Sequence, residues 1–435
     1  MFGSILFGLF GLGSLLAIAW MFSNNRGRVD WTLVGTGVVL QILFAMFVLL
    51  TTFGAAIFDT LAHGFVTLSG FTAEGARLIF GNLLDAKTYG FIFAFQVLPT
   101  IIFFASLMAV LYHLGVMQMI VRGMAFAITK VMRVSGAETT TVCASVFIGQ
   151  TEAPLTVRPY IPKMTESELM TMMIGGMAHI AGGVMATYVQ MLGGPDPEQQ
   201  AIFAKHFLAA SIMAAPATFV IAKLLVPEVG EPLTRGEVKV HFEKTTANII
   251  DAAASGAADG LKLALNIAAM LLAFTALIAM LNAIIGWGAD VTGIAGWINS
   301  GREVPVVINL GSILGVLLSP IAWLIGIPWD DAVIAGGLIG QKIVLNEFIA
   351  YGQLATIPVG EGAAAISAET KLILTYALCG FANFASIAIQ IGGIGSLAPE
   401  RRSDLARLGL RAVLGGSLAT FMTATIAGVL LKFTS

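Results

Sequence analysis

The chain has 435 residues, of which 57% are hydrophobic and 11% are charged, and its mean hydropathy is +0.90. Soluble domains carry about 25% charged residues, so this composition excludes an ordinary soluble protein and predicts an all-α polytopic protein surrounded by the lipid bilayer. The 23 basic and 25 acidic side chains give a net charge of −2, so there is no electrostatic ground to expect a nucleic-acid partner.

The spans can be placed from the apolar segments in chain order. The first segment, 2–22, has no basic region before it and no small-residue cleavage pattern after it, so we expect a retained span rather than a signal peptide. A spanning helix needs about 20 apolar residues. Eight segments meet that length: 2–22, 32–50, 91–114, 169–192, 203–224, 263–287, 371–393 and 407–431.

Basic residues set the orientation of these spans, because Lys and Arg in short loops stay on the cytoplasmic side. Arg26 and Arg28 lie between the first two spans, which places that loop inside and the N-terminus outside. With eight spans the C-terminus also falls outside, as does the loop at 193–200, which carries no Lys or Arg. The sequence therefore predicts a multi-pass protein of the cell (inner) membrane with both termini on the outer, periplasmic side.

Three apolar stretches fit poorly as spans. Residues 54–69 contain Asp59 and His63, and we expect a helix lying in the membrane interface. Residues 115–134 carry three basic side chains, and 304–327 contains two prolines. We expect both of these to form helices flanking the membrane.

The two halves of the chain share an order of features. In each half a flanking helix leads to an acidic residue, a short apolar run with Gly-Gln, a glutamate and then a span. The two spans contain Gly-Met-Ala-His-Ile-Ala at 176–181 and Gly-Phe-Ala-Asn-Phe-Ala at 380–385. Because the orientation count turns the halves in opposite directions, we expect an inverted repeat, a common plan of secondary transporters.

Each half also contains a segment that fits a re-entrant hairpin. Residues 141–157 lie between Arg133 and Arg158, and both flanks belong inside. About eight residues at 1.5 Å each span only about 12 Å, so the chain must turn back at 149–154. Residues 332–354 form the matching hairpin from the other side. Irregular backbone at this depth is tolerated only beside protein or a water-filled cavity, so we expect polar sites at the tips.

The two hairpins each carry a glutamate, Glu152 and Glu347. A carboxylate inside a membrane costs several kcal/mol and persists mostly where it is functional or paired. We interpret both as functional; the alternative is that they pair with Lys342 or cap half-helices. Gln150 and Thr151 share the first tip and are interpreted in the same way.

Other polar residues lie within spans. Asn383 and Ser386 are spaced i, i+3 on one helical face and suit a polar ligand, or else hold helices together. His179, at the repeat position of Asn383, is left open between a proton relay, a ligand contact and packing. The two cysteines have no metal-ligand spacing, and common nucleophile, zinc and P-loop motifs are missing from the sequence. We therefore expect neither an enzyme nor an organic cofactor.

Four motifs then follow one another along the chain: Gly-Gln-Thr-Glu-Ala-Pro-Leu at 149–155, Gly-Gly-Met-Ala-His-Ile-Ala-Gly at 175–182, Asn-Glu-Phe at 346–348 and Cys-Gly-Phe-Ala-Asn at 379–383. With these motifs the chain closely resembles the concentrative nucleoside transporter family, as a bacterial member, nearly end to end. The resemblance implies a homotrimer of eight-span protomers. Each protomer has a scaffold domain and a transport domain that moves by elevator-like alternating access.

The resemblance also implies a domain division. The scaffold takes spans one to three and the interfacial helix (1–114), and the cytoplasmic loop with span six (227–302). The transport domain takes the first repeat (115–226) and the second repeat (303–435).

The family's substrate contacts carry over to eight positions that match its motifs. The resemblance assigns the nucleobase to Gln150, Thr151, Glu152 and Val184, the ribose hydroxyls to Glu347, Asn383 and Ser386, and an apolar wall to Phe381. A buried carboxylate that accepts from two vicinal hydroxyls would be left unpaired by an analogue without them.

The cation site of the family matches less well. Its positions here are Ser145, Ile148, His179 and Ile180, and the family pattern has Asn and Ser or Thr in place of Ser145 and His179. Sodium prefers oxygen, whereas imidazole suits softer metals, so proton coupling is favoured. Sodium stays an alternative, because backbone carbonyls and the serine can bind it.

The expected function is a secondary active transporter that imports nucleosides by symport with a proton or Na⁺. The main alternative is a passive channel for polar solutes, which requires a continuous polar pore rather than two hairpins that meet midway. A membrane-embedded enzyme rests only on the buried glutamates. Preference for purines or pyrimidines is not predicted.

Overall fold

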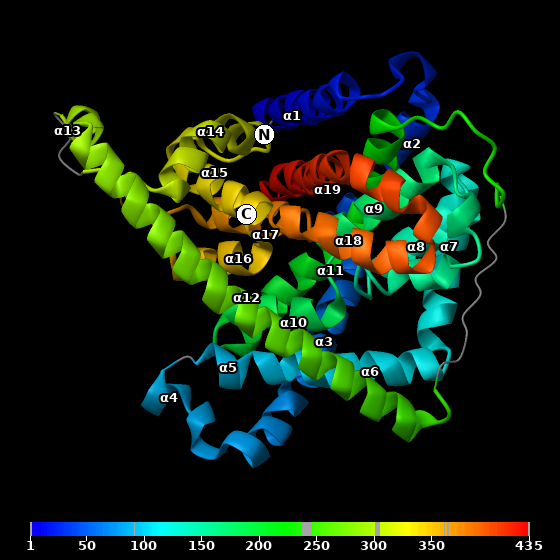
Figure 1. The fold of residues 1–435 in the computed structure, drawn as a ribbon, viewed down its shortest axis with the longest axis horizontal. Coiled ribbons are helices and arrows are strands. Elements are labelled where there is room, and N and C mark those ends of the chain that lie inside the picture. Colours follow the sequence, from blue (N-terminus) through cyan, green and yellow to red (C-terminus); the bar gives the residue numbers. More distant parts are fainter. Residues whose placement is uncertain are drawn as a thin grey trace.

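The computed structural model describes residues 2–90, 92–236, 246–300, 305–360, 362 and 365–433, and within these every regular element is a helix (Figure 1). Helices satisfy their backbone hydrogen bonds within one segment, which is the requirement that lipid imposes. The all-α class expected from composition is confirmed.

The N-terminal part holds two spans and a long third helix. α1 (Phe2–Met21) and α2 (Trp31–Leu50) match the expected spans, and Asp30 caps the start of α2. α3 (Thr52–Phe80) is longer than the interfacial helix expected at 54–69. Its last turns carry Glu74 and Arg77, which pair at 3.3 Å. Such an i, i+3 ion pair stabilises a helix. A hydropathy window does not show these turns, because it ends where charged residues begin.

The next span is α5 (Phe93–Gln96) followed directly by α6 (Leu98–His113), after a short helix α4 (Ala86–Tyr89). α12 (Ile249–Val291) was expected only over 263–287. It runs across the whole molecule (Figure 1), and its 43 residues give a length of about 65 Å. The added turns contain charged residues and begin at the cap Asn248, so hydropathy underestimates this helix. α13 (Ile294–Asn299) follows it.

The first repeat contains five helices: α7 (Val116–Met132), α8 (Gly136–Ser145), α9 (Glu166–Ala178), α10 (Gly182–Gly193) and α11 (Pro197–Leu225). Only the first arm of the expected hairpin, α8, is α-helical. The return arm consists of two 3₁₀ segments, Ala153–Val157 and Ile161–Lys163, each with proline in its first turn. Proline has no N–H to give to an α-helix.

The second repeat has the same order of elements: α14 (Leu310–Leu324), α15 (Trp329–Val344), α16 (Glu347–Thr356), α17 (Ala368–Ala377), α18 (Phe384–Leu397) and α19 (Arg402–Leu431). This shared order supports the repeat; its inverted sense stays a prediction. α14 bends by 116° into α15. The two helices touch closely, since a β-carbon on Gly336 would lie 2.7 Å from Gly315 O. The bend fits either one broken span or a re-entrant segment, so the expectation that α14 flanks the membrane stays a prediction.

Seven of the expected spans are long and apolar enough to cross a membrane among the described helices: Phe2–Met21, Trp31–Leu50, Phe93–His113, Glu166–Gly193, Pro197–Leu225, Ile249–Val291 and Pro399–Leu431. The segment expected as the eighth span, 371–393, holds α17 and α18, whose 10 and 14 residues are each too short to cross alone, so this span stays a prediction. The multi-pass membrane architecture is therefore confirmed.

Burial divides the helices into two groups. The apolar windows of α11 and α19 are 89% buried, whereas that of α12 is 6% buried. α1 and α2 pack on this central pair, where Gln41 Nε2 donates to Thr423 Oγ1 at 3.0 Å. α12 packs instead along α6. The core that holds the broken helices thus lies at the centre of the molecule, and the assignment of helices to two moving domains stays a prediction.

Candidate functional site

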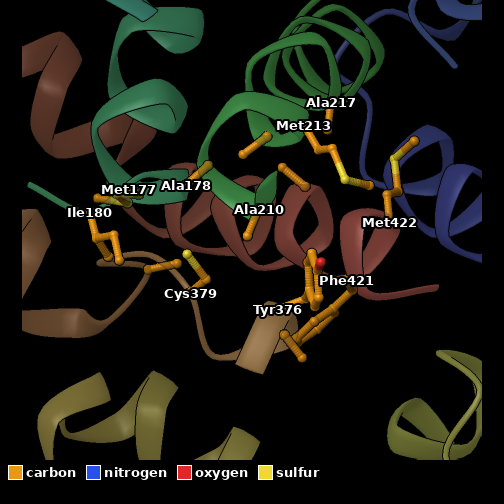
Figure 2. Packing of buried hydrophobic residues seen from close by; sticks show 14 of the residues in the cluster. Met177, Ala178, Ile180, Ala210, Met213, Ala217, Tyr376, Cys379, Phe421 and Met422 are labelled. Carbon is orange, nitrogen blue, oxygen red and sulfur yellow. The ribbon is translucent and has the colours of Figure 1, made fainter. Parts of the chain in front are cut away.

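Two helices are interrupted at the centre of the core. α9 ends at Ala178 and α10 begins at Gly182, while α17 ends at Ala377 and α18 begins at Phe384. Met177, Ala178, Ile180 and Cys379 gather where these interruptions meet (Figure 2).

Gly380 lies at this crossing. Its φ of +123° and the 2.7 Å that would separate its β-carbon from Met177 O both require glycine. The crossing therefore brings irregular backbone from both repeats to one place.

The first hairpin tip lies against both broken helices. Gly182 N donates to Phe147 O at 3.1 Å, which joins the tip to the start of α10. A β-carbon on Gly393 of α18 would lie 2.8 Å from Thr151 Cγ2. Thr151 itself is half-buried. The tip expected from hydropathy thus reaches the interruptions, although its return arm is not helical.

The second hairpin delivers Glu347 to the same region. Asn346 caps α16 by accepting from Ile349 N at 3.0 Å, and Glu347 is the first residue of that helix. Glu347 is only 2% exposed. Tyr188 OH donates to its Oε1 at 3.0 Å, and Asn383 Nδ2 donates to its Oε2 at 3.0 Å. Both carboxylate oxygens are thereby held from two different helices.

Hydrogen bonds join this carboxylate to the first hairpin. Asn383 Oδ1 accepts from Ser386 N at 2.9 Å, and Gln150 Nε2 donates to Ser386 Oγ at 3.0 Å. Gln390 Nε2 in turn donates to Gln150 Oε1 at 3.1 Å. Four of the expected substrate residues, Gln150, Glu347, Asn383 and Ser386, therefore lie in one buried network.

The other expected substrate residues stand outside this network. Glu152 is exposed, and its Oε2 occupies the space that a β-carbon on Gly149 would take. Val184 is buried on α10, and Phe381 is half-buried in the interruption before α18. In this structure the two hairpin glutamates thus have different surroundings: Glu152 is exposed, whereas Glu347 is buried and accepts one side-chain hydrogen bond on each oxygen.

Lys342, offered as a structural partner of Glu347, forms no ion pair with it in the part of the chain that the structure describes. Its side chain is fully buried on α15, and Nζ lies 6.0 Å from the ring centroid of Phe421. Glu347 is paired instead with the hydroxyl and amide described above.

The expected cation residues lie beside the first interruption. Gly175 O can only accept, so the 2.7 Å contact with His179 Nδ1 means that this nitrogen carries the hydrogen. Ser145 Oγ donates to Thr141 O at 2.9 Å. Ile180 is buried and Ile148 half-buried. Among the described residues no group of three or more His, Cys, Asp or Glu side chains could hold a metal ion.

Sequence reasoning missed Tyr188 and Gln390. Both are fully buried polar side chains in apolar helices. Each lies four positions after an expected site residue, Val184 and Ser386, and so on the same helical face. That spacing is the signal that was present in the sequence.

A cavity of about 330 Å³ lies apart from these residues, between α3 and α11. Its lining includes Asp59, His63, Glu198, Lys205 and His206. None of the expected substrate or cation residues lines it, so it is not part of the site described above.

Family models match almost the whole chain. They are "Na+ dependent nucleoside transporter N-terminus" over residues 10–83, "Nucleoside recognition" over 94–195 and "Na+ dependent nucleoside transporter C-terminus" over 206–428.

Relatives of this chain include transporters named for nucleosides and an uncharacterised transporter. "Nucleoside permease NupC" of Helicobacter pylori is 39% identical over 98% of this chain and 98% of its own length. "Uncharacterized transporter YutK" of Bacillus subtilis is 43% identical over 98% of this chain and 99% of its own length. "Sodium/nucleoside cotransporter 1" of Homo sapiens is 36% identical over 97% of this chain, which spans 63% of that protein.

Solved structures similar to this chain include two states of CNTnw. Its inward-facing substrate-bound state has a TM-score of 0.87 and 42% identity, covering 99% of both chains. A double variant in an outward-facing state has a TM-score of 0.88 and 42% identity, covering 99% of this chain and 98% of that one.

Proposed function

The chain belongs to the Na⁺-dependent nucleoside transporter family, and we propose that the network joining Gln150, Ser386, Asn383 and Glu347 is its nucleoside-binding site. The protein is a multi-pass nucleoside transporter that works by cation-coupled alternating access. Its similarity to both inward- and outward-facing CNTnw supports this mechanism over a passive channel.

Ribose recognition rests on the geometry around Glu347. Each carboxylate oxygen has about two acceptor positions, and Tyr188 and Asn383 use one on each. Two vicinal hydroxyls can then donate to the remaining positions. A nucleoside without those hydroxyls would bury a carboxylate with unmet acceptors, which costs binding energy.

The nucleobase is assigned to the first tip. Gln150 offers an amide at the edge of the network, and Thr151 lies against α18 beside it. Val184 and Phe381 supply apolar surface. Glu152 is included because its position matches the family motif. Its side chain is exposed at the tip, and we expect it to contact the base when a nucleoside is bound.

The coupling cation is a proton, taken up beside the first interruption. His179 is buried there and gives its Nδ1 hydrogen to Gly175 O, so Nε2 is the atom left to accept one. Sodium is the second candidate, because the family models carry sodium in their descriptions. It would use Ser145 Oγ and the carbonyls of Ile148 and Ile180.

The protomer acts as a homotrimer in the cell membrane, with both termini outside. The apolar window of α12 is only 6% buried within the protomer, which is consistent with a surface that contacts lipid or a second subunit. The scaffold takes 1–114 and 227–302, and the transport domain takes 115–226 and 303–435. The transported nucleoside leaves unmodified, without enzymatic turnover.

Labelled uridine uptake into proteoliposomes, with a proton gradient and a sodium gradient imposed separately, tests this proposal. We expect saturable uptake driven by the proton gradient, and unmodified uridine in the lumen. Uptake driven only by the sodium gradient would show that the coupling cation is sodium and not a proton. Non-saturable uptake indifferent to both gradients would contradict symport altogether.

A further inference from the structure

Gln390 of α18 is a fully buried amide that none of the family motifs above includes. Its Nε2 donates to Met173 O at 2.9 Å and to Gln150 Oε1 at 3.1 Å. Both hydrogens of its amide are thereby used. Gln390 connects α9, α18 and the tip of the first hairpin.

These two bonds fix the orientation of both amides. Met173 O is a backbone carbonyl and can only accept, so the nitrogen of Gln390 must face it. The atom of Gln150 that faces the same nitrogen must also accept, and is therefore its oxygen. Gln150 Nε2 is then turned to Ser386 Oγ, to which it donates at 3.0 Å.

The surroundings are shaped for this pair of amides. A β-carbon on Gly176 would lie 2.9 Å from Gln390 Nε2 and 2.9 Å from Gln150 Cβ. Glycine at this position of α9 leaves the space in which the two side chains meet. The Gln150 amide has two orientations, in which its NH₂ group and its oxygen exchange places. Ser386 Oγ can either donate or accept, so the bond from Gln390 Nε2 is what selects the orientation.

We propose that Gln390 is a positioning residue that fixes the Gln150 amide through its bond to Met173 O, and so sets which nucleobase edge the transporter prefers. The inference rests on the proposed function, in which Gln150 contacts the base. Uracil and cytosine are the suitable probes because they have the same shape. Uracil presents N3–H and O4, whereas cytosine presents N3 and N4–H₂, so donors and acceptors are exchanged.

The test is Gln390→Met, which keeps the side-chain length and removes both donors. We expect the ratio of uridine to cytidine transport efficiency to change by about threefold or more, the size of one neutral hydrogen bond. The change should lie in KM and not in maximal rate. The preference for uridine over 2′,3′-dideoxyuridine should stay as in the wild type, because Tyr188 and Asn383 still hold Glu347.

Gln41→Met is the matched control. Gln41 is equally buried and donates to Thr423 on α19, away from the site, so its loss should leave the uridine-to-cytidine ratio unchanged. An unchanged ratio in Gln390→Met, or an equal change in both variants, would overturn the inference. Gln390→Ala serves if the methionine variant does not fold; if neither folds, Gln390 is structural and the inference fails. A wild-type protein that transports no nucleoside would instead refute the proposed function.

Discussion

Glu347 is the buried carboxylate to which we assign ribose binding. Glu347→Gln keeps the size of the side chain but replaces one carboxylate oxygen by an NH₂ group, which faces either the donor Tyr188 or the donor Asn383. We expect the KM for uridine to rise about 10- to 100-fold, because a hydrogen bond to a charged group contributes about 1.5–3 kcal/mol. Uptake kinetics in proteoliposomes measure this. Near-normal kinetics in a well-folded variant would show that the hydroxyls bind elsewhere.

Tyr188 holds the same carboxylate from α10. Tyr188→Phe removes one donor to Oε1, and we expect the KM for uridine to rise about tenfold with little loss of thermal stability. Tyr351→Phe is the control: Tyr351 is also fully buried, its ring centroid lies 4.5 Å from that of Tyr188, and its hydroxyl donates to Thr375 O. If both variants raise KM equally, the effect comes from losing a buried hydroxyl in this cluster and not from the bond to Glu347.

A substitution at His179 tests which cation is coupled to transport. His179→Ser removes the imidazole and supplies a hydroxyl oxygen, which suits sodium. We expect uptake to lose its response to a proton gradient and to gain a response to sodium. His206→Gln is the control, because His206 is also buried but pairs with Tyr376 OH at 2.8 Å, away from the first interruption. If uptake by His179→Ser still follows the proton gradient, His179 has no part in coupling and its role is the structural bond to Gly175 O.

The site was partly predictable from single residues. Glu347, Asn383 and Ser386 were expected because polar side chains are rare in spans, and the structure brings them together. Tyr188 and Gln390 were not expected. Their partners lie 159 and 240 positions away along the chain, so the pairing depends on how the helices cross. The exposure of Glu152 has the same origin, since sequence shows a tip but not which way its side chains turn.

At the scale of elements, the crossing of the two interruptions is the feature most sensitive to change. Gly380→Ala would place a side chain at a φ of +123° and 2.7 Å from Met177 O. Positive φ alone costs about 1–3 kcal/mol for other residues. We expect a lower thermal midpoint in detergent and loss of uptake.

Gly392→Ala on α18 is the matched control for that change. A β-carbon there meets nothing within 4 Å, and alanine favours helix over glycine by about 1 kcal/mol. Its thermal midpoint should stay or rise. Equal thermal midpoints for the two alanine variants would mean that the close contact between Gly380 and Met177 does not contribute to stability.

Helix positions were predictable from apolar windows, and helix ends were less so. α3 and α12 continue beyond their apolar windows. Their extra turns carry charged residues, which a helix accommodates but a hydropathy window excludes. The return arm of the first hairpin is not α-helical because Pro154, Pro159 and Pro162 recur within it. That signal was present in the sequence, but hydropathy does not weigh it.

At the scale of the whole molecule, the proposed domain division predicts that the central helices shift against those around them during alternating access. Asp59 of α3 and Lys205 of α11 form an ion pair of 2.8 Å between these groups, at the cavity described above. Both side chains are partly exposed, at 51% and 21%, and such a pair contributes about 0–1 kcal/mol. Its loss alone should therefore leave uptake largely unchanged.

A covalent link at this position tests whether α11 moves past α3. We expect Asp59→Cys/Lys205→Cys to transport uridine until a short bifunctional thiol reagent joins the two positions, and then to stop, because the link holds one state of the cycle. The native Cys143 and Cys379 are buried, and each single variant treated with the reagent controls for modification without linkage. Full uptake by protein shown by mass to be linked would mean that α3 and α11 move together. The shift would then have to take place along another surface, the contact of α6 with α10.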